Sequence, residues 1–330
     1  MKNLVRIPRD VEIPMIGLVQ IGIIDRGTNL LQIRPTSTCN LNCIFCSTDA
    51  GKFSKYHVTE YFVEKDYLID WLKEIIKFKG SIHAFIDSVG EVFTYPKILD
   101  LLSDISGMEG VKSIAIETNG TLLDEKIITE LEDINIDRIN LSLHALDEQL
   151  NKKLTGCEGY DTERMIEIIK YIAGTKIELC ITPVWIPGLN DGEIPKIIKF
   201  AKEEVKNKRF PILGIQKYEI HKFGRKPKGV KPISWYKFFD QLEKWEKEFQ
   251  VKLRIGPNDF GIEKSKNLPS TFKIGEKVLV EIRAPGWMKN ERIGVARERS
   301  LTVVDCEENV GKILKVRILR NKHNIYIAKK

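Results

Sequence analysis

From residue 30 onward, short apolar runs typical of strands alternate with longer amphipathic stretches typical of helices. The predicted strands cover residues 30–34, 81–87, 111–117, 138–143, 176–184 and 211–218. The predicted helices cover residues 60–79, 96–105, 125–131, 160–173, 194–206 and 234–249. Strands that alternate with helices predict βαβ units around a parallel sheet, so we expect an α/β fold.

The two ends of the chain follow other patterns. Before residue 30, short apolar runs and a polar turn predict a strand or hairpin that leads into the first strand of the sheet. The last sixty residues predict short strands at residues 272–282, 294–296, 301–304, 315–318 and 324–328. Five short strands separated by turn residues are typical of a small all-β barrel of the OB type. The predicted domains are residues 1–29, 30–232, 233–270 and 271–330, the third being a helical closing segment and linker.

Composition narrows the class of protein. The chain has 330 residues, of which 42% are hydrophobic and 30% are charged, as in a soluble protein with one large and one small domain. No apolar run approaches the roughly 20 residues of a membrane span, so we expect no membrane partner. Three of the six cysteines share one short stretch, which argues against a disulfide framework. A reducing cytoplasm is therefore the expected location.

Charge is distributed unevenly along the chain. The whole sequence has a formal net charge of +7. Residues 271–330 contain 14 Lys and Arg against seven Asp and Glu, so this segment carries the entire excess. A basic tail on a neutral body predicts a polyanionic partner, although a solvated basic surface without function would have the same composition.

Three cysteines at the end of the first predicted strand carry the chemistry. Cys39, Cys43 and Cys46 have the spacing Cys-x3-Cys-x2-Cys. Thiolates suit iron–sulfur clusters or zinc. A closed zinc site needs a fourth ligand, which usually belongs to a second pair of ligands. The nearest histidine, His57, lies eleven residues beyond Cys46, and no second ligand accompanies it in the sequence. Three ligands on a four-iron cube leave one iron open to a ligand that is not protein.

This motif, with Phe45 just before the last cysteine, resembles the signature of the radical S-adenosylmethionine superfamily. The resemblance implies a partial (β/α)6 barrel and a [4Fe–4S] cluster held by the three cysteines. It also implies S-adenosylmethionine as cofactor, a 5′-deoxyadenosyl radical as product of its cleavage, and an electron donor such as ferredoxin or flavodoxin. In such barrels functional residues gather at the carboxyl ends of the strands.

The resemblance assigns S-adenosylmethionine contacts to the ends of successive strands. Gly90-Glu91 matches the core of a Gly-Gly-Glu-Pro-like segment, without its first Gly and its Pro. The run from Val184 to Asp191 resembles a loop that packs on adenine, with Asn190 and Asp191 capping the next helix. The full set of expected contacts is Phe45, Gly90, Glu91, Glu117, Asn119, Ser142, His144, Val184 and Ile186.

Two residues are candidates for a role in catalysis. His144 ends the fourth predicted strand and could contact the cofactor or the substrate, although a strand-end histidine is more often a plain hydrogen-bonding residue. Cys157 lies on a flexible loop after that strand. Some RNA-methylating members of the superfamily use extra catalytic cysteines, and an incidental thiol is the alternative. Cys180, inside an apolar strand, is predicted to be a core residue.

Residues 271–330 resemble a TRAM domain, an RNA-binding barrel appended to several RNA-modifying enzymes. The resemblance makes RNA, above all tRNA, the expected substrate and partner. Trp287, in an inserted-looking turn, could stack on a base or pack against the barrel. The expected RNA contacts are Lys222, Arg225, Lys226, Trp287, Arg297, Arg299, Arg317 and Arg320. The alternatives are a radical enzyme for a peptide or small molecule, and a non-catalytic RNA-binding protein that keeps the cluster for structure.

Overall fold

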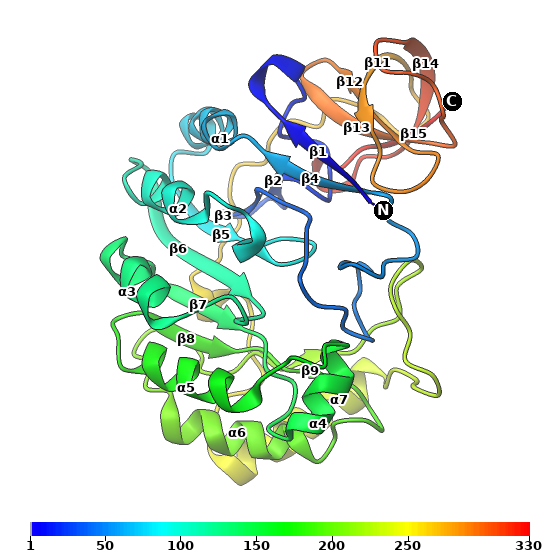
Figure 1. The fold of residues 1–330 in the computed structure, drawn as a ribbon. Coiled ribbons are helices and arrows are strands. Elements are labelled where there is room, and N and C mark those ends of the chain that lie inside the picture. Colours follow the sequence, from blue (N-terminus) through cyan, green and yellow to red (C-terminus); the bar gives the residue numbers. More distant parts are fainter. Residues whose placement is uncertain (1) are drawn as a thin grey trace. The chain divides into compact units, whose positions relative to one another are not determined.

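The structure is a computed structural model that describes residues 2–330. Contacts within the chain define two compact units, whose elements are labelled in Figure 1. The first unit comprises Met1–Cys39, Ser54–Ser113 and Glu263–Lys330, and the second comprises Asn40–Phe53 and Ile114–Ile262. These divisions do not follow the domain boundaries predicted at residues 29, 232 and 270.

The sheet of the first unit begins with the predicted strand at residues 30–34. Here β2 (Gly22–Asp25) pairs antiparallel with β3 (Leu30–Arg34), and β3 pairs parallel with β5 (Ile82–Ile86). Helices α1 (Lys65–Lys79) and α2 (Ile98–Ser106) bury apolar side chains such as Leu72 and Leu101. Both helices lie on the same side of β3 and β5 (Figure 1). This is the βαβ arrangement that the alternating pattern predicted.

The prediction of one helix over residues 60–79 was wrong in its first turn. Residues Thr59–Val63 form β4, which pairs parallel with β1 (Asn3–Ile7). Thr59, Tyr61 and Val63 are buried while the residues between them are partly exposed, which is the period of a strand. Aromatic and β-branched residues favour this conformation once a partner strand is available, and α1 starts only after Glu64.

The second unit continues the alternation of strands and helices. Its sheet has the parallel order β6-β7-β8, and β9 pairs parallel with β10. These strands are β6 (Val111–Thr118, from residue 114 onward in this unit), β7 (Arg138–Leu141), β8 (Glu178–Ile181), β9 (Val184–Trp185) and β10 (Gln216–Lys217). Its helices are α3 (Glu125–Asp133), α4 (Glu148–Thr155), α5 (Thr162–Ala173), α6 (Glu193–Glu204) and α7 (Trp235–Phe249).

Side-chain oxygens fix where most of these helices begin. Asp124, Asp147, Asp161 and Ser234 each accept a hydrogen bond from the backbone N–H three residues later, so each is an N-cap. Asp147 explains helix α4, which the sequence analysis missed. Helix α6 begins after Gly192 without a side-chain cap, so the predicted capping role of residues 190 and 191 was wrong.

Strand β7 presents two chemically different faces. Leu141 lies next to Met165 of α5, because a Cβ on Gly120 would touch both side chains. Arg138 and Asn140 therefore lie on the opposite face, away from the helix. Asn140 is the register partner of Glu117 on β6 and of Cys180 on β8. We call this polar surface of β6, β7 and β8 the inner face.

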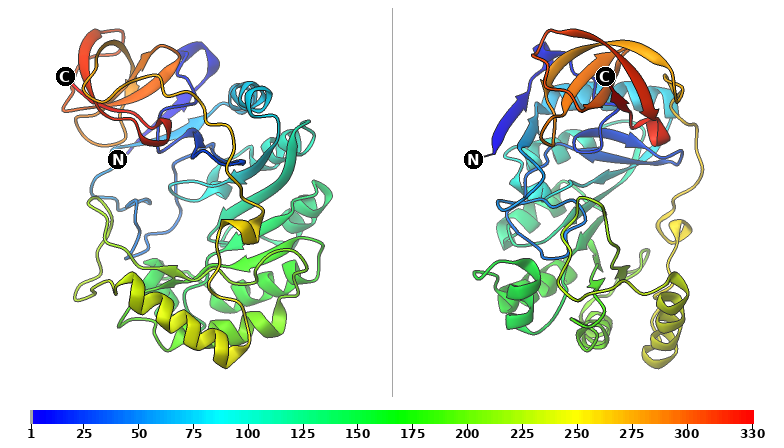
Figure 2. Two further views of the ribbon diagram at one scale, coloured as in Figure 1. Left: turned by 180° about the vertical axis from the view of Figure 1, so that it is seen from behind. Right: turned by 90° about the vertical axis from the view of Figure 1, so that its right-hand side faces the viewer.

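The C-terminal segment forms the predicted all-β barrel, in orange to red in Figure 2. The barrel is closed, with strand order β11-β12-β13-β15-β14; β13 and β15 are parallel and the other pairs are antiparallel. Its strands are β11 (Lys277–Pro285), β12 (Arg292–Ala296), β13 (Arg299–Val304), β14 (Ile313–Arg320) and β15 (Ile327–Lys329). Alternate side chains, among them Val280, Val303 and Val316, fill its core.

The barrel is bonded to the N-terminal segment within the first unit. Ser300 N–H donates to Ile16 O at 2.9 Å, its hydroxyl donates to Pro14 O at 2.7 Å, and Tyr326 N–H donates to Gly17 O at 2.9 Å. A Cβ on Gly17, whose φ is +132°, would lie 1.8 Å from Ser300 O. Only glycine allows this approach.

Across residues 2–330, no helix combines the length and the apolar character that crossing a membrane requires.

Candidate active site

The loop between β3 and β4 carries the three motif cysteines. Cys39, Cys43 and Cys46 form no disulfide and are partly exposed. Among residues 2–330, no three His, Cys, Asp or Glu side chains converge on a single metal ion. A four-iron cluster sets a different requirement, because each thiolate binds its own iron. Three accessible soft donors on one short loop fit such a cluster.

Residues 40–50, which we call the cluster loop, are held by the C-terminal end of α4 in the second unit. Asn42 N–H donates to Thr155 O and Ile44 N–H donates to Leu154 O, both at 2.9 Å. Gly156 follows with a φ of +60°, and a Cβ there would lie 2.4 Å from Asn42 O. These contacts fix the main chain on both sides of Cys43.

Phe45 anchors the loop in an apolar cluster. Its ring is buried and meets the His144 ring edge-on, with centroids 4.8 Å apart. Ile186 packs in the same cluster and is 0% exposed, while Val184 lies at its border and is partly exposed. The expectation that Ile186 faces adenine was therefore wrong, because its side chain packs beneath the cluster loop.

Arg225 clamps the cluster loop. Its guanidinium donates to Cys43 O at 3.0 Å and to Ala50 O, and its Nε lies 2.8 Å from Asp49 Oδ1. Its backbone N–H donates to Cys46 O at 2.8 Å. These groups hold the main chain around two of the cysteines, and the predicted RNA contact of Arg225 stays a prediction.

Gly224 makes the clamp possible. A Cβ at this position would lie 2.8 Å from Ser47 O and 2.9 Å from Cys46 O. The glycine therefore lets residues 224 and 225 lie directly against the cluster loop. The neighbouring Lys222 and Lys226 side chains are exposed, so their predicted RNA contacts stay predictions.

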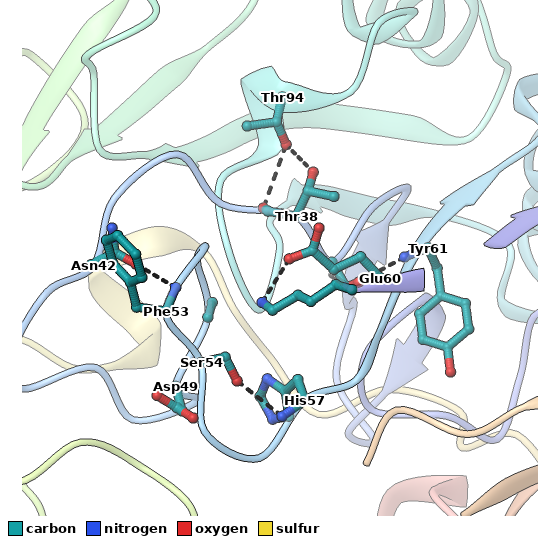
Figure 3. A network of polar contacts seen from close by, with 12 residues as sticks. Thr38, Asn42, Asp49, Phe53, Ser54, His57, Glu60, Tyr61 and Thr94 are labelled. Atoms are coloured by element: carbon teal, nitrogen blue, oxygen red, sulfur yellow. Dashed lines mark hydrogen bonds and ion pairs between the residues drawn. The ribbon is translucent and has the colours of Figure 1, made fainter. Parts of the chain in front are cut away.

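In the first unit, the segment at Gly90 lies against the residues around Cys39. A Cβ on Gly90 would lie 2.1 Å from Thr38 O and 2.9 Å from the Cys39 Cβ. Glu91 N–H donates to Thr38 O at 2.7 Å, and the hydroxyls of Thr38 and Thr94 are hydrogen-bonded (Figure 3). This cradle requires glycine next to Cys39, and the expected contact of Gly90 with S-adenosylmethionine stays a prediction.

Glu91 itself is buried. Its carboxylate accepts a hydrogen bond from Phe93 N–H at 3.0 Å and so caps the short helical turn Val92–Thr94. The structure thus gives this carboxylate a local structural role, and its expected contact with an ammonium group stays a prediction.

His144 is buried and neutral. Its Nδ1 accepts a hydrogen bond from Val184 N–H at 3.1 Å, which places the ring proton on Nε2. Burial lowers the pKa of His144 to about 4. Asn190 Nδ2 donates to both His144 O and Val184 O, so the ends of β7 and β9 are tied together.

The other expected cofactor contacts of the second unit follow its strands. Asn119 lies just beyond β6, and its Nδ2 donates to Asn40 Oδ1 at 3.0 Å, so it binds the start of the cluster loop. Glu117 lies on the inner face, where Asn140 Nδ2 approaches its Oε2 at 3.5 Å. Ser142 follows β7 and is partly exposed. Their roles toward the cofactor stay predictions.

Cys157 comes directly after the glycine that touches the cluster loop. Its backbone N–H donates to Lys152 O, its carbonyl accepts from Tyr160 N–H, and its thiol is partly exposed. The structure therefore places this residue beside the segment that supports Cys43. A role in catalysis stays a prediction.

Trp287 is not available to a base. Its ring is 8% exposed and stacks on His57 with centroids 3.8 Å apart, which corrects the prediction of an RNA contact. Arg297 is ion-paired with Glu276, and Arg299 Nη1 donates to the carbonyl of residue 298. The remaining predicted contacts on the barrel, Arg317 and Arg320, are exposed.

Sequence reasoning missed the partners that shape the site. Asp49 and Arg225 are separated by 175 intervening residues, so no local pattern links them. Arg138 did carry a signal, because it is the only charged residue in the predicted strand at residues 138–143.

Comparison of sequences gives the family. The family model described as the radical SAM superfamily matches residues 33–201. Uncharacterized protein MJ0103 of Methanocaldococcus jannaschii is 41% identical over 339 aligned residues, which cover 96% of this chain and 78% of that protein. The probable GTP 3′,8-cyclase of Thermococcus kodakarensis is 30% identical over 179 residues, which cover 53% of this chain and 54% of the cyclase.

Comparison of structures agrees on the fold. The crystal structure of Streptococcus suis SuiB bound to S-adenosylmethionine superposes with a TM-score of 0.53 at 19% identity, over 69% of this chain and 49% of SuiB. The matched family model covers the three motif cysteines and the glycine cradle beside Cys39. The chain therefore belongs to the radical S-adenosylmethionine superfamily, whose cofactors are a [4Fe–4S] cluster and S-adenosylmethionine.

Proposed function

We propose that this radical S-adenosylmethionine enzyme modifies RNA, with tRNA as the leading substrate. When bound, the cofactors supply a one-electron cleavage that yields a 5′-deoxyadenosyl radical. Cys39, Cys43 and Cys46 would each ligate one iron, and the electron would come from a donor such as ferredoxin or flavodoxin. The work of the protein is to hold and shield this chemistry.

The residues around the cluster loop perform that work. Arg225 and Asn42 fix the main chain that carries two of the thiols, and Gly90 lets the backbone approach Cys39. His144 is neutral above about pH 4, so it would add no positive charge to a site that holds the cationic cofactor.

The C-terminal barrel is the observation that supports RNA as substrate. A closed five-stranded barrel in which β13 and β15 are parallel has the strand order of an OB-type fold, which commonly binds oligonucleotides. Its segment carries the whole net charge of +7. Arg317 and Arg320 extend from β14 as exposed cations.

A salt series of tRNA binding tests this proposal. Replacing Arg317 and Arg320 with Gln should weaken binding and reduce the salt slope by about one for each lost phosphate contact. The matched control replaces Lys126 and Lys199, exposed on the second unit, with Gln. Identical curves for both pairs and the wild type would remove the barrel as the RNA-binding element. Release of 5′-deoxyadenosine, measured separately, tests the radical reaction.

A second candidate is a radical reaction on a small anionic molecule. A buried guanidinium, that of Arg138, on the inner face favours it. The name of the related cyclase, with GTP as its substrate, points in the same direction. Formation of 5′-deoxyadenosine that depends on a small anion, without tRNA binding, would favour this candidate.

A further inference from the structure

The inner face carries a buried positive charge. Arg138 is 6% exposed, and its Nε donates to Asn140 Oδ1 at 2.9 Å. Its guanidinium carbon lies 4.6 Å from the Phe210 ring centroid and 4.4 Å from that of Phe260. The side chain therefore lies against Asn140 of the same strand, with two aromatic rings beside it.

This charge lacks a bonded counter-ion. Within residues 2–330, Arg138 forms no ion pair, and its two Nη groups have no hydrogen-bond acceptor. The adjacent Arg209 is exposed and pairs with Asp137 and Glu178. Burying a charge without a bonded partner is unfavourable. Desolvation accordingly lowers the pKa of Arg138.

The acidic groups near Arg138 are engaged elsewhere. Glu178 accepts hydrogen bonds from the backbone N–H groups of residues 208–210, and Asp137 accepts from Ile114 N–H. Asn140 contacts both Glu117 and Arg138, and Glu117 acts on Arg138 through its charge without forming an ion pair. A ligand oxyanion would therefore be the bonded partner of Arg138.

Neutral polar groups continue the inner face toward the carboxyl ends of its strands. Thr182 is buried, and its Oγ1 has no hydrogen-bond partner in the described part of the chain. Gly214 packs closely against this face, because a Cβ there would lie 3.3 Å from the Thr182 side chain and 3.4 Å from the Cys180 sulfur. Burial raises the pKa of the Cys180 thiol to about 12, so this thiol is neutral.

The order of side chains along β7 relates this group to the cofactor. Arg138 and Asn140 share one face of β7, and Ser142 and His144 follow beyond the carboxyl end of the strand. His144 adjoins Phe45 of the cluster loop at the far end of this series, so Arg138 lies deeper. A molecule between them would direct its charged end to Arg138 and its reacting end to the radical.

We propose that Arg138 binds an oxyanion, the carboxylate or phosphate group, of the molecule on which the radical acts, with Asn140 and Thr182 as neutral hydrogen-bonding neighbours. The guanidinium fork matches either group through two parallel hydrogen bonds. This inference rests on the proposed radical reaction and not on RNA as the substrate.

Thermal unfolding of the full-length reconstituted protein tests the inference. The probes are inorganic phosphate and acetate, each titrated at constant ionic strength and compared with chloride. Wild-type protein should be stabilised by at least one probe, because a ligand that binds only the folded state raises its stability. Preference for phosphate or for acetate identifies the class of oxyanion. Arg138→Met should weaken this response at least about tenfold, as expected for loss of a charge-assisted contact.

Two further variants separate binding from structure. Arg209→Met removes the neighbouring surface charge and should respond to the probes like the wild type. Arg138→Lys should regain part of the response, because it restores the charge without the planar fork. In chloride, Arg138→Met should be at least as stable as the wild type, because it relieves a buried charge.

Two results would overturn the inference: an unchanged response in Arg138→Met, or a response lost equally in Arg209→Met. Absence of stabilisation of the wild type by either probe would also overturn it. The readout does not depend on activity. Failure to form 5′-deoxyadenosine therefore counts against the proposed function, whereas failure to bind oxyanions counts against this inference.

Discussion

The clamp between Arg225 and the cluster loop allows a quantitative prediction. Arg225→Gln removes the hydrogen bonds to Cys43 O and Ala50 O and takes the cation away from Asp49. The Asp49 side chain is 1% exposed and that of Arg225 is 16% exposed, so both charges lie in a largely desolvated setting. Breaking a buried pair by removing one partner costs about 3–5 kcal/mol.

Much of this cost should appear as loss of the cluster, because the clamp holds the main chain at Cys43 and Cys46. We expect Arg225→Gln to hold clearly less iron than the wild type after anaerobic reconstitution and to unfold at lower urea concentration. Iron analysis, the electron paramagnetic resonance spectrum of the reduced protein and urea unfolding measure these effects. Lys226→Gln, an equal charge change at the next exposed residue, is the matched control and should leave all three unchanged.

Adding Asp49→Asn to Arg225→Gln should recover part of the loss, because the double variant no longer buries an isolated carboxylate. Contacting residues are not additive, so the double variant should lose less than the sum of the single variants. If Arg225→Gln keeps full iron content and wild-type unfolding, the ion pair does not support the cluster loop and the reasoning is refuted. Strict additivity would show that Asp49 and Arg225 act independently.

Three more predictions follow from the same region. A single cubane cluster contains about four irons per chain, and replacing Cys39, Cys43 and Cys46 together with Ala should abolish their binding. Full iron content in this triple variant would contradict the assignment of the three ligands. Gly90→Ala should impair binding of S-adenosylmethionine in equilibrium dialysis while the protein stays folded by circular dichroism, because its Cβ would collide with the backbone before Cys39. Burial lowers the pKa of His144 to about 4 in the folded protein, below the value of about 6.5 in the unfolded chain. As the pH falls, the imidazole is therefore protonated in the unfolded chain before it is protonated in the folded protein. The stability contributed by neutral His144 is complete above about pH 6.5 and falls by about 3 kcal/mol toward pH 4, so urea unfolding of His144→Gln should lack this part of the pH dependence.

The sequence by itself determined the elements whose signals are local. The strand Leu30–Arg34 has its predicted bounds, because its apolar residues are bracketed by turn residues and by the cysteine motif. The motif identified the family, and its spacing within eight residues predicts Cys39, Cys43 and Cys46 as the cluster ligands. The five strands of the C-terminal barrel were also predicted, because alternating side chains and turn residues recur over short distances.

Only the tertiary structure decided what each surface contacts. Residues Thr59–Val63 became a strand because β1 offers a parallel partner more than fifty residues earlier. Ile186 and Trp287 were assigned to ligands from their residue types, yet each is buried by distant segments. Arg225 had the composition of an exposed basic loop, but its clamp depends on carbonyl groups whose directions no sequence pattern records. Hydrogen bonds and burial between distant segments depend on how the chain folds back on itself, which local periodicity does not encode.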